Sequence, residues 1–84
     1  MTLVNRLGLH ARAASKLVQT ASRFEARTWI ERNGRCVNAK SIMGVLLLAA
    51  PCGTELLVRI EGEDEEQAMA ALQALVDSRF GEDE

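Results

Sequence analysis

The stretch ARTWIERNGRCVN, residues 26–38, decides the fold of this 84-residue chain. Its first seven residues alternate, so that Thr28 and Ile30 share one face of an extended segment and Trp29 lies on the other. Asn33-Gly34 follows at once, and this dipeptide between two β-prone segments is the strongest short-range signal for a hairpin turn. We therefore predict an antiparallel hairpin around this turn, with Trp29 partly exposed on its outer face.

Extended and helical patterns alternate on both sides of the hairpin. Apolar residues recur at helical spacing after Ala11 and again near the C-terminus, whereas the segment 55–61 alternates strictly between apolar and polar residues. The predicted strands are 2–4, 26–32, 35–38 and 55–61, and the predicted helices are 11–21, 41–49 and 63–79. This order favours an α+β domain of two layers, in which a mostly antiparallel sheet is covered by helices on one face.

The length and composition restrict the class of protein. A chain of 84 residues is too short for two independent cores, so we expect one domain over residues 1–84. The longest apolar stretch, 45–52, is far below the ~20 residues that span a bilayer, and the N-terminus lacks a secretory pattern, so we expect a cytoplasmic protein. Cys36 and Cys52 form neither a disulfide framework nor a zinc pattern, and we interpret both as small, partly buried residues.

The charges are divided unevenly along the chain. Residues 1–41 contain eight Lys or Arg and two Glu, whereas residues 42–84 contain two Arg and ten Asp or Glu. The net charge of −2 predicts no general affinity for nucleic acid. The division predicts a basic patch and an acidic patch on one small body, unless both are simply solvated faces.

His10 is the residue with the clearest chemical potential. It precedes the first predicted helix, at the position where Ser, Thr, Asp or Asn usually accepts hydrogen bonds from the first amides. Those amides and the helix dipole attract an anion and disfavour a charged imidazole, while Arg12 in the first turn offers a guanidinium for a phosphate. These three features favour a phosphoryl group carried on the ring, although a lone histidine in such a loop is more often an ordinary surface residue.

Ser41 and the residues after it form a second candidate site. Ser41 opens the second predicted helix, where a phosphate would again meet a helix N-terminus, but the residue alone is better explained as a plain N-cap. Ile42, Met43 and Leu46 lie on a helix too short to bury every face, so they form either a docking surface or part of the core.

Two motifs together resemble a known family. Gly8-Leu9-His10-Ala11-Arg12-Ala13-Ala14, followed about thirty residues later by Lys40-Ser41-Ile42-Met43-Gly44-Val45, is similar to the HPr family, the histidine-containing phosphocarriers of the bacterial phosphotransferase system. The resemblance covers essentially the whole chain. It implies an open-faced β-sandwich in the order βαββαβα, with a four-stranded antiparallel sheet covered on one face by three helices.

The resemblance also implies a role for each candidate residue. His10 would accept a phosphoryl group on Nδ1 from phosphoenolpyruvate-charged enzyme I and pass it to an enzyme IIA, with Arg12 stabilising the phosphate. Ser41 would be a regulatory phosphorylation site where a serine kinase/phosphorylase exists, and Ile42, Met43, Leu46 and Lys40 would form the docking face. The protein would be a monomeric relay rather than an enzyme, with no cofactor and no metal.

The sequence departs from the family pattern at Ala13, where many members have proline, a residue that pre-organises the first turn of a helix. Ala13 and the acidic end Glu82-Asp83-Glu84 also resemble the nitrogen-related HPr paralogue, so the sugar and nitrogen branches both stay open. A rival interpretation from another class is a small regulatory domain that acts by docking, without phosphoryl transfer.

Overall fold

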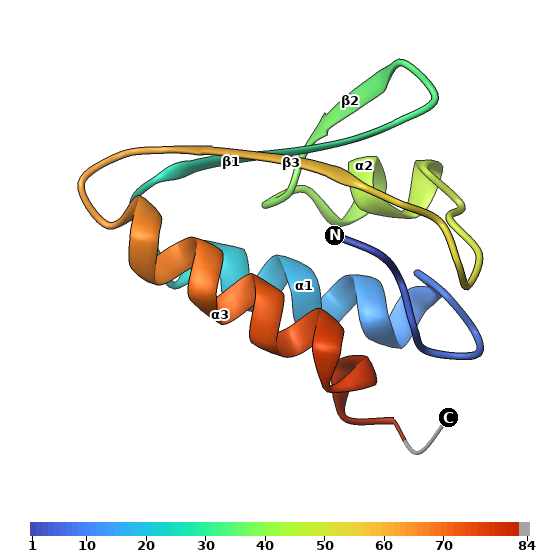
Figure 1. Ribbon diagram of the computed structural model, residues 1–84. Coiled ribbons are helices and arrows are strands. Elements are labelled where there is room, and N and C mark those ends of the chain that lie inside the picture. Colours follow the sequence, from blue (N-terminus) through green and yellow to red (C-terminus); the bar gives the residue numbers. More distant parts are fainter. Residues whose placement is uncertain (83–84) are drawn as a thin grey trace.

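A computed structural model describes residues 1–82 as a sheet with helices on one face (Figure 1). The sheet contains three antiparallel strands in the order β2-β1-β3. The elements follow one another as α1 (Ala11–Ser22), β1 (Arg27–Arg32), β2 (Arg35–Asn38), α2 (Ile42–Leu47), β3 (Leu57–Glu61), α3 (Glu65–Asp77) and a 3₁₀ turn, η1 (Arg79–Gly81). The α+β class and the open-faced arrangement are thus confirmed.

The predicted hairpin is present, with its turn at Asn33-Gly34. Asn33 and Gly34 both have positive φ, 51° and 80°, and Arg32 pairs directly with Arg35 across the turn. Two consecutive positive φ angles match the right-handed twist of the flanking strands, which explains why Asn-Gly stands here. Trp29 is half-buried on the outer face, as predicted, and the guanidinium carbon of Arg59 lies 4.6 Å from the centroid of its ring.

The expectation of a four-stranded sheet is wrong for the described residues. The segment 2–4 forms only an isolated bridge, between Thr2 and Glu55. Its backbone bonds go largely to the turn before β3: the amide of Leu3 donates to Thr54 O (2.9 Å) and Leu3 O accepts from the amide of Gly53 (2.8 Å). Because that turn is not extended, the N-terminal segment is tied to the sheet edge without forming a ladder.

The expectation of partly buried cysteines is also wrong, since Cys36 and Cys52 are both exposed. Neighbouring side chains of a strand point to opposite faces of the sheet. Val37 packs against the core, so Cys36 faces outward. Cys52 lies in the exposed turn 51–53.

Part of the basic charge in residues 1–41 is used within the fold. Lys40 Nζ donates to Phe24 O (2.7 Å), just after α1, and Arg32 Nη1 donates to Leu48 O (2.6 Å) at the end of α2. Cationic side chains suit these positions because the C-terminal end of a helix carries partial negative charge. The predicted basic patch is therefore partly a set of helix-end contacts.

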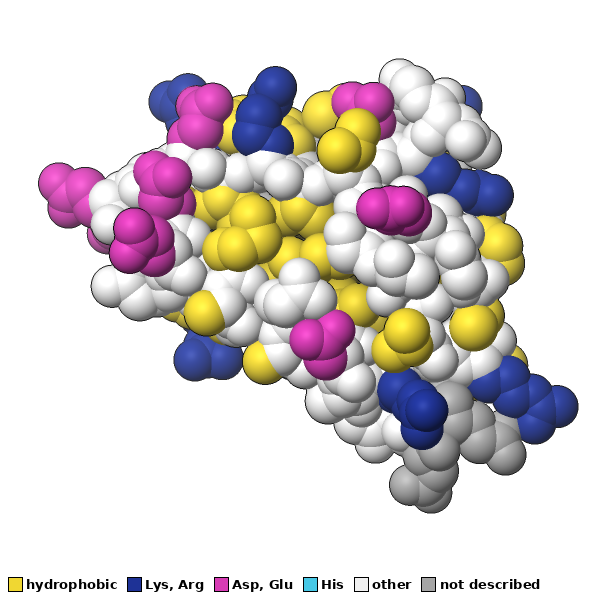
Figure 2. Space-filling model, viewed as in Figure 1, with side chains coloured by type: hydrophobic (Ala, Val, Ile, Leu, Met, Phe, Trp, Pro, Cys, Tyr) yellow, Lys and Arg dark blue, Asp and Glu magenta, His cyan; other side chains and the backbone are white. Residues whose placement is uncertain are grey.

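Acidic side chains gather over the turn between β3 and α3 (Figure 2). Asp64 precedes α3, and its two carboxylate oxygens accept hydrogen bonds from the amides of Glu25 and Ala26, each at 2.9 Å. This contact lowers the pKa of Asp64, chiefly through the amide of Glu25, while partial burial acts against it. Asp64 thus joins the link between α1 and β1 to the start of α3.

No helix in residues 1–82 is long and apolar enough to cross a membrane.

Candidate functional site

A tight loop places His10 at the start of α1. Gly8 has φ +65°, and a Cβ built on it would lie 2.4 Å from Ala50 O, so only glycine fits. The amide of Leu9 then donates to that same carbonyl at 2.8 Å. The loop before His10 is thereby fixed against the segment that follows α2.

His10 is the N-cap residue of α1, as predicted, and its side chain makes no capping hydrogen bond. Its backbone is extended (φ −74°, ψ 179°), and the first turn of α1 contains no acidic residue. The helix is twelve residues long, so its N-terminal end has the partial positive charge that attracts anions. Arg12 stands exposed in that first turn.

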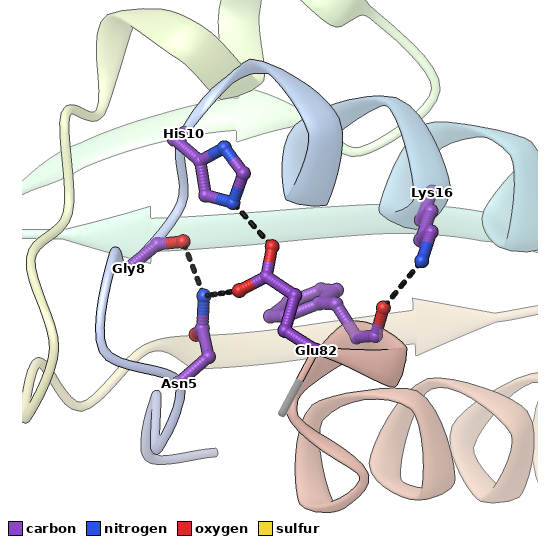
Figure 3. A network of polar contacts seen from close by, with 6 residues as sticks. Asn5, Gly8, His10, Lys16 and Glu82 are labelled. Atoms are coloured by element: carbon purple, nitrogen blue, oxygen red, sulfur yellow. Dashed lines mark hydrogen bonds and ion pairs between the residues drawn. The ribbon is translucent and has the colours of Figure 1, made fainter. Parts of the chain in front are cut away.

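A glutamate far along the chain contacts the imidazole (Figure 3). His10 Nε2 forms a short contact with Glu82 Oε2, and the two side chains are 27% and 12% exposed. The other carboxylate oxygen, Oε1, accepts from Asn5 Nδ2 at 3.0 Å, and the same Nδ2 donates to Gly8 O at 2.7 Å. Sequence reasoning missed both Asn5 and Glu82, because 72 residues separate Glu82 from His10 and no local pattern connects them.

A left-handed turn delivers Glu82 to this site. Arg79, Phe80 and Gly81 all have positive φ, 58°, 56° and 77°, so the chain reverses sharply after α3. Phe80 is fully buried, and Lys16 Nζ of α1 donates to its carbonyl oxygen at 2.6 Å (Figure 3). A buried aromatic ring and a lysine on α1 therefore hold two non-glycine residues in a conformation they rarely adopt.

The electrostatics of the site decide how the imidazole is protonated. The hydrogen bond from Asn5 is the main cause that lowers the pKa of Glu82. The hydrogen bond and charge of His10 and the charge of Arg12 lower this pKa further, whereas burial raises it. An ionised carboxylate can only accept hydrogen bonds, so Nε2 of His10 must carry the proton. The other ring nitrogen, Nδ1, lies on the side of the ring away from Glu82 and towards α1 (Figure 3).

The second candidate site lies on α2, which packs against α1. Ser41 is its N-cap, and its Oγ accepts from the amide of Gly44 at 3.2 Å, as the sequence predicts. The hydrogen bonds described for Ser41 stay within residues 38–45, so the structure does not join it to His10. Lys40 points its amine at Phe24 O rather than at an open rim.

Apolar side chains are exposed along α2. Ile42 is 40% exposed, Met43 66% and Leu46 37%, so these residues are not fully absorbed by the core. Leu47, which sequence reasoning did not single out, is 61% exposed. Its position inside a run of three leucines hid the direction of its side chain.

Comparisons with known proteins agree with this architecture. A family model described as "PTS HPr component phosphorylation site" matches residues 1–78. The chain is 60% identical over 83 residues to a phosphocarrier protein HPr of Xylella fastidiosa (strain Temecula1), covering 99% of this chain and 93% of that protein. It is 53% identical over 83 residues to the phosphocarrier protein HPr of Cupriavidus necator, with the same two coverages. A crystal structure of HPr-C-His from Thermoanaerobacter tengcongensis superposes with a TM-score of 0.96 at 45% identity, covering 100% of this chain and 94% of that one.

Proposed function

The chain belongs to the HPr family of phosphocarrier proteins, and from this premise we propose that it carries a phosphoryl group on Nδ1 of His10. The phosphoryl group comes from enzyme I, charged by phosphoenolpyruvate, and goes to an enzyme IIA. The carrier works in the cytosol as a relay between phosphotransferase enzymes rather than as a catalyst with its own turnover.

The observation that carries this proposal is the contact between Nε2 of His10 and the carboxylate of Glu82. Glu82 contacts Nε2, so in the neutral form of the ring an ionised Glu82 favours the proton on Nε2 and leaves the lone pair on Nδ1, on the side towards α1. The uncapped N-terminus of α1 and the guanidinium of Arg12 supply positive potential beside it. A nucleophilic nitrogen next to an anion-attracting helix end suits phosphoryl transfer, which depends on positioning and charge stabilisation.

The exposed apolar side chains of α2 support a docking role beside the transfer site. Ile42, Met43 and Leu46 form an adaptable surface, whereas the amine of Lys40 is bound to Phe24 O. A carrier must release each partner quickly, so we expect small interfaces, below about 1,200 Å². Ser41 begins the same helix, and a kinase that phosphorylated it would add negative charge to this face.

Radiolabelled phosphoenolpyruvate and purified enzyme I test the proposal directly. The wild-type chain should take up label that is labile in acid and stable in base, and His10→Ala should take up none, because Nδ1 is absent. Gln67→Ala, which alters an exposed residue of α3, is the control and should label like the wild type. A wild-type chain that takes up no label would overturn the proposal and favour the rival, a domain that docks without phosphoryl transfer.

A further inference from the structure

We propose that Glu82 is a positioning residue for the transfer: its carboxylate fixes the protonation of the His10 ring and balances the positive charge that the ring acquires. This inference rests on the proposed function and deepens it. Glu82 does not touch the phosphoryl group in this proposal, because it contacts Nε2, on the side of the ring away from Nδ1 (Figure 3).

The carboxylate is held by a built site rather than by chance contact. Asn5 is 0% exposed, and its Nδ2 donates both to Glu82 Oε1 (3.0 Å) and to Gly8 O (2.7 Å). From the other side, Lys16 holds the carbonyl of Phe80 within the left-handed turn that precedes Glu82. Three separate parts of the chain, around Asn5, Lys16 and Phe80, thus converge to place one carboxylate against one ring nitrogen.

A carboxylate at Nε2 has two consequences for the transfer step. It holds the proton on Nε2, so that the lone pair of the neutral ring is on Nδ1. The Nδ1 lone pair then forms the new nitrogen–phosphorus bond while the bond between phosphorus and the donor atom of enzyme I breaks, and the donor atom keeps that electron pair. Since the Nε2 proton stays on the ring, the ring becomes positively charged, and Glu82 supplies the balancing negative charge beside it.

The orientation of Asn5 makes a sharp prediction for Glu82→Gln. Gly8 O fixes Nδ2 of Asn5 as a donor towards position 82. The carbonyl oxygen of a glutamine there would turn to Asn5, and its NH₂ group would face Nε2 of His10. A donor at Nε2 favours the proton on Nδ1, which blocks the nucleophile.

Transfer from phosphorylated enzyme I, measured in single turnovers, provides the first readout. Glu82→Ala should slow transfer about tenfold to hundredfold, by analogy with the loss seen when the carboxylate partner of a metal-ligating histidine is removed. Glu82→Gln, although closer in shape to glutamate, should be slower still. The concentration of enzyme I that gives half the maximal rate should change little, and Glu66→Gln, an exposed residue on α3, is the matched control and should transfer at the wild-type rate.

Nitrogen-15 NMR of the His10 ring in the free protein provides a second readout that needs no enzyme I. The wild type should show the proton on Nε2, Glu82→Ala a mixture of the two tautomers, and Glu82→Gln a shift towards Nδ1. Unchanged ring spectra, or a Glu82→Gln rate equal to wild type, would overturn the inference. If the wild type is never phosphorylated, the proposed function fails, and the NMR series separately decides whether Glu82 sets the tautomer.

Discussion

At the scale of single residues, Glu82 interacts with both His10 and Arg12. Arg12 is positive and exposed in the first turn of α1, and its charge contributes to the low pKa of Glu82. In the proposed transfer, a phosphoryl group on Nδ1 would give the guanidinium a second anion to bind. Arg12 would then interact with the site both before and after transfer.

We expect Arg12→Ala to slow phosphoryl acceptance about tenfold to hundredfold, since a charge-assisted hydrogen bond contributes ~1.5–3 kcal/mol. Transfer should not stop, because the amides of α1 still attract the phosphate. Arg12→Lys should be intermediate, since it keeps the charge and loses the two-pronged geometry. Rapid-quench kinetics with enzyme I measures these rates, and Arg35→Ala at the hairpin is the control for lost charge. Equal rates for Arg12→Ala and wild type would remove Arg12 from the site.

At the scale of elements, α2 combines a structural cap with the proposed docking surface. Ser41 caps the helix through the amide of Gly44, and the exposed Met43 and Leu47 lie within the next two turns. A charge placed at Ser41 therefore enters the proposed docking face without disturbing His10, which lies on another segment.

Ser41→Asp tests this arrangement. Asp is itself a good N-cap, so the free energy of unfolding should change by less than ~1 kcal/mol. The added negative charge should weaken association with an acidic partner and so reduce acceptance at low enzyme I concentrations, and high salt should shrink the loss. Ser41→Ala should show the opposite pattern: stability falls by ~1 kcal/mol, whereas transfer stays near normal. If Ser41→Asp accepts the phosphoryl group at the wild-type rate at both low and high salt, Ser41 acts only as a helix cap.

The elements also show where sequence reasoning succeeds and fails. The hairpin and the strand Leu57–Glu61 follow from alternation and turn chemistry, which are local properties. The segment 2–4 has the residues of a strand, but its partner is an irregular turn, and no pattern within the segment reveals its partner. His10 is recognisable because an N-cap is defined by its neighbours, whereas Asn5 and Glu82 reach the site only through the tertiary fold.

At the scale of the whole molecule, Asp64 connects distant parts of the fold. Its carboxylate holds the amides of Glu25 and Ala26, which are 39 and 38 residues away along the chain. The link between α1 and β1 and the start of α3 are thereby held together.

This contact makes stability depend on acid. Because the pKa of Asp64 is lowered in the folded state, the contact contributes fully above the ordinary value of 3.8 and is lost as pH falls through the folded value. Urea unfolding of the wild type should therefore show a decline in stability below about pH 3.8. Asp64→Ala should be less stable at neutral pH, and its decline should be shallower in that range. Glu63→Gln, at the exposed neighbouring position, should keep the wild-type decline.

Every primary amine of the chain points at a backbone carbonyl. The sequence has only two lysines, and Lys16, Lys40 and the amine of Met1 donate to Phe80 O, Phe24 O and Leu56 O at 2.6, 2.7 and 2.7 Å. A hydrogen bond to a carbonyl slows acylation of an amine, so a rise in each modification rate reports the loosening of one particular corner of the domain. Reaction at Lys16 reports loosening of the C-terminal turn. Reaction at Lys40 reports loosening of the junction after α1, and reaction at Met1 reports loosening of the edge beside β3. Amine labelling followed by peptide mass analysis thus measures local unfolding separately at three places in the domain.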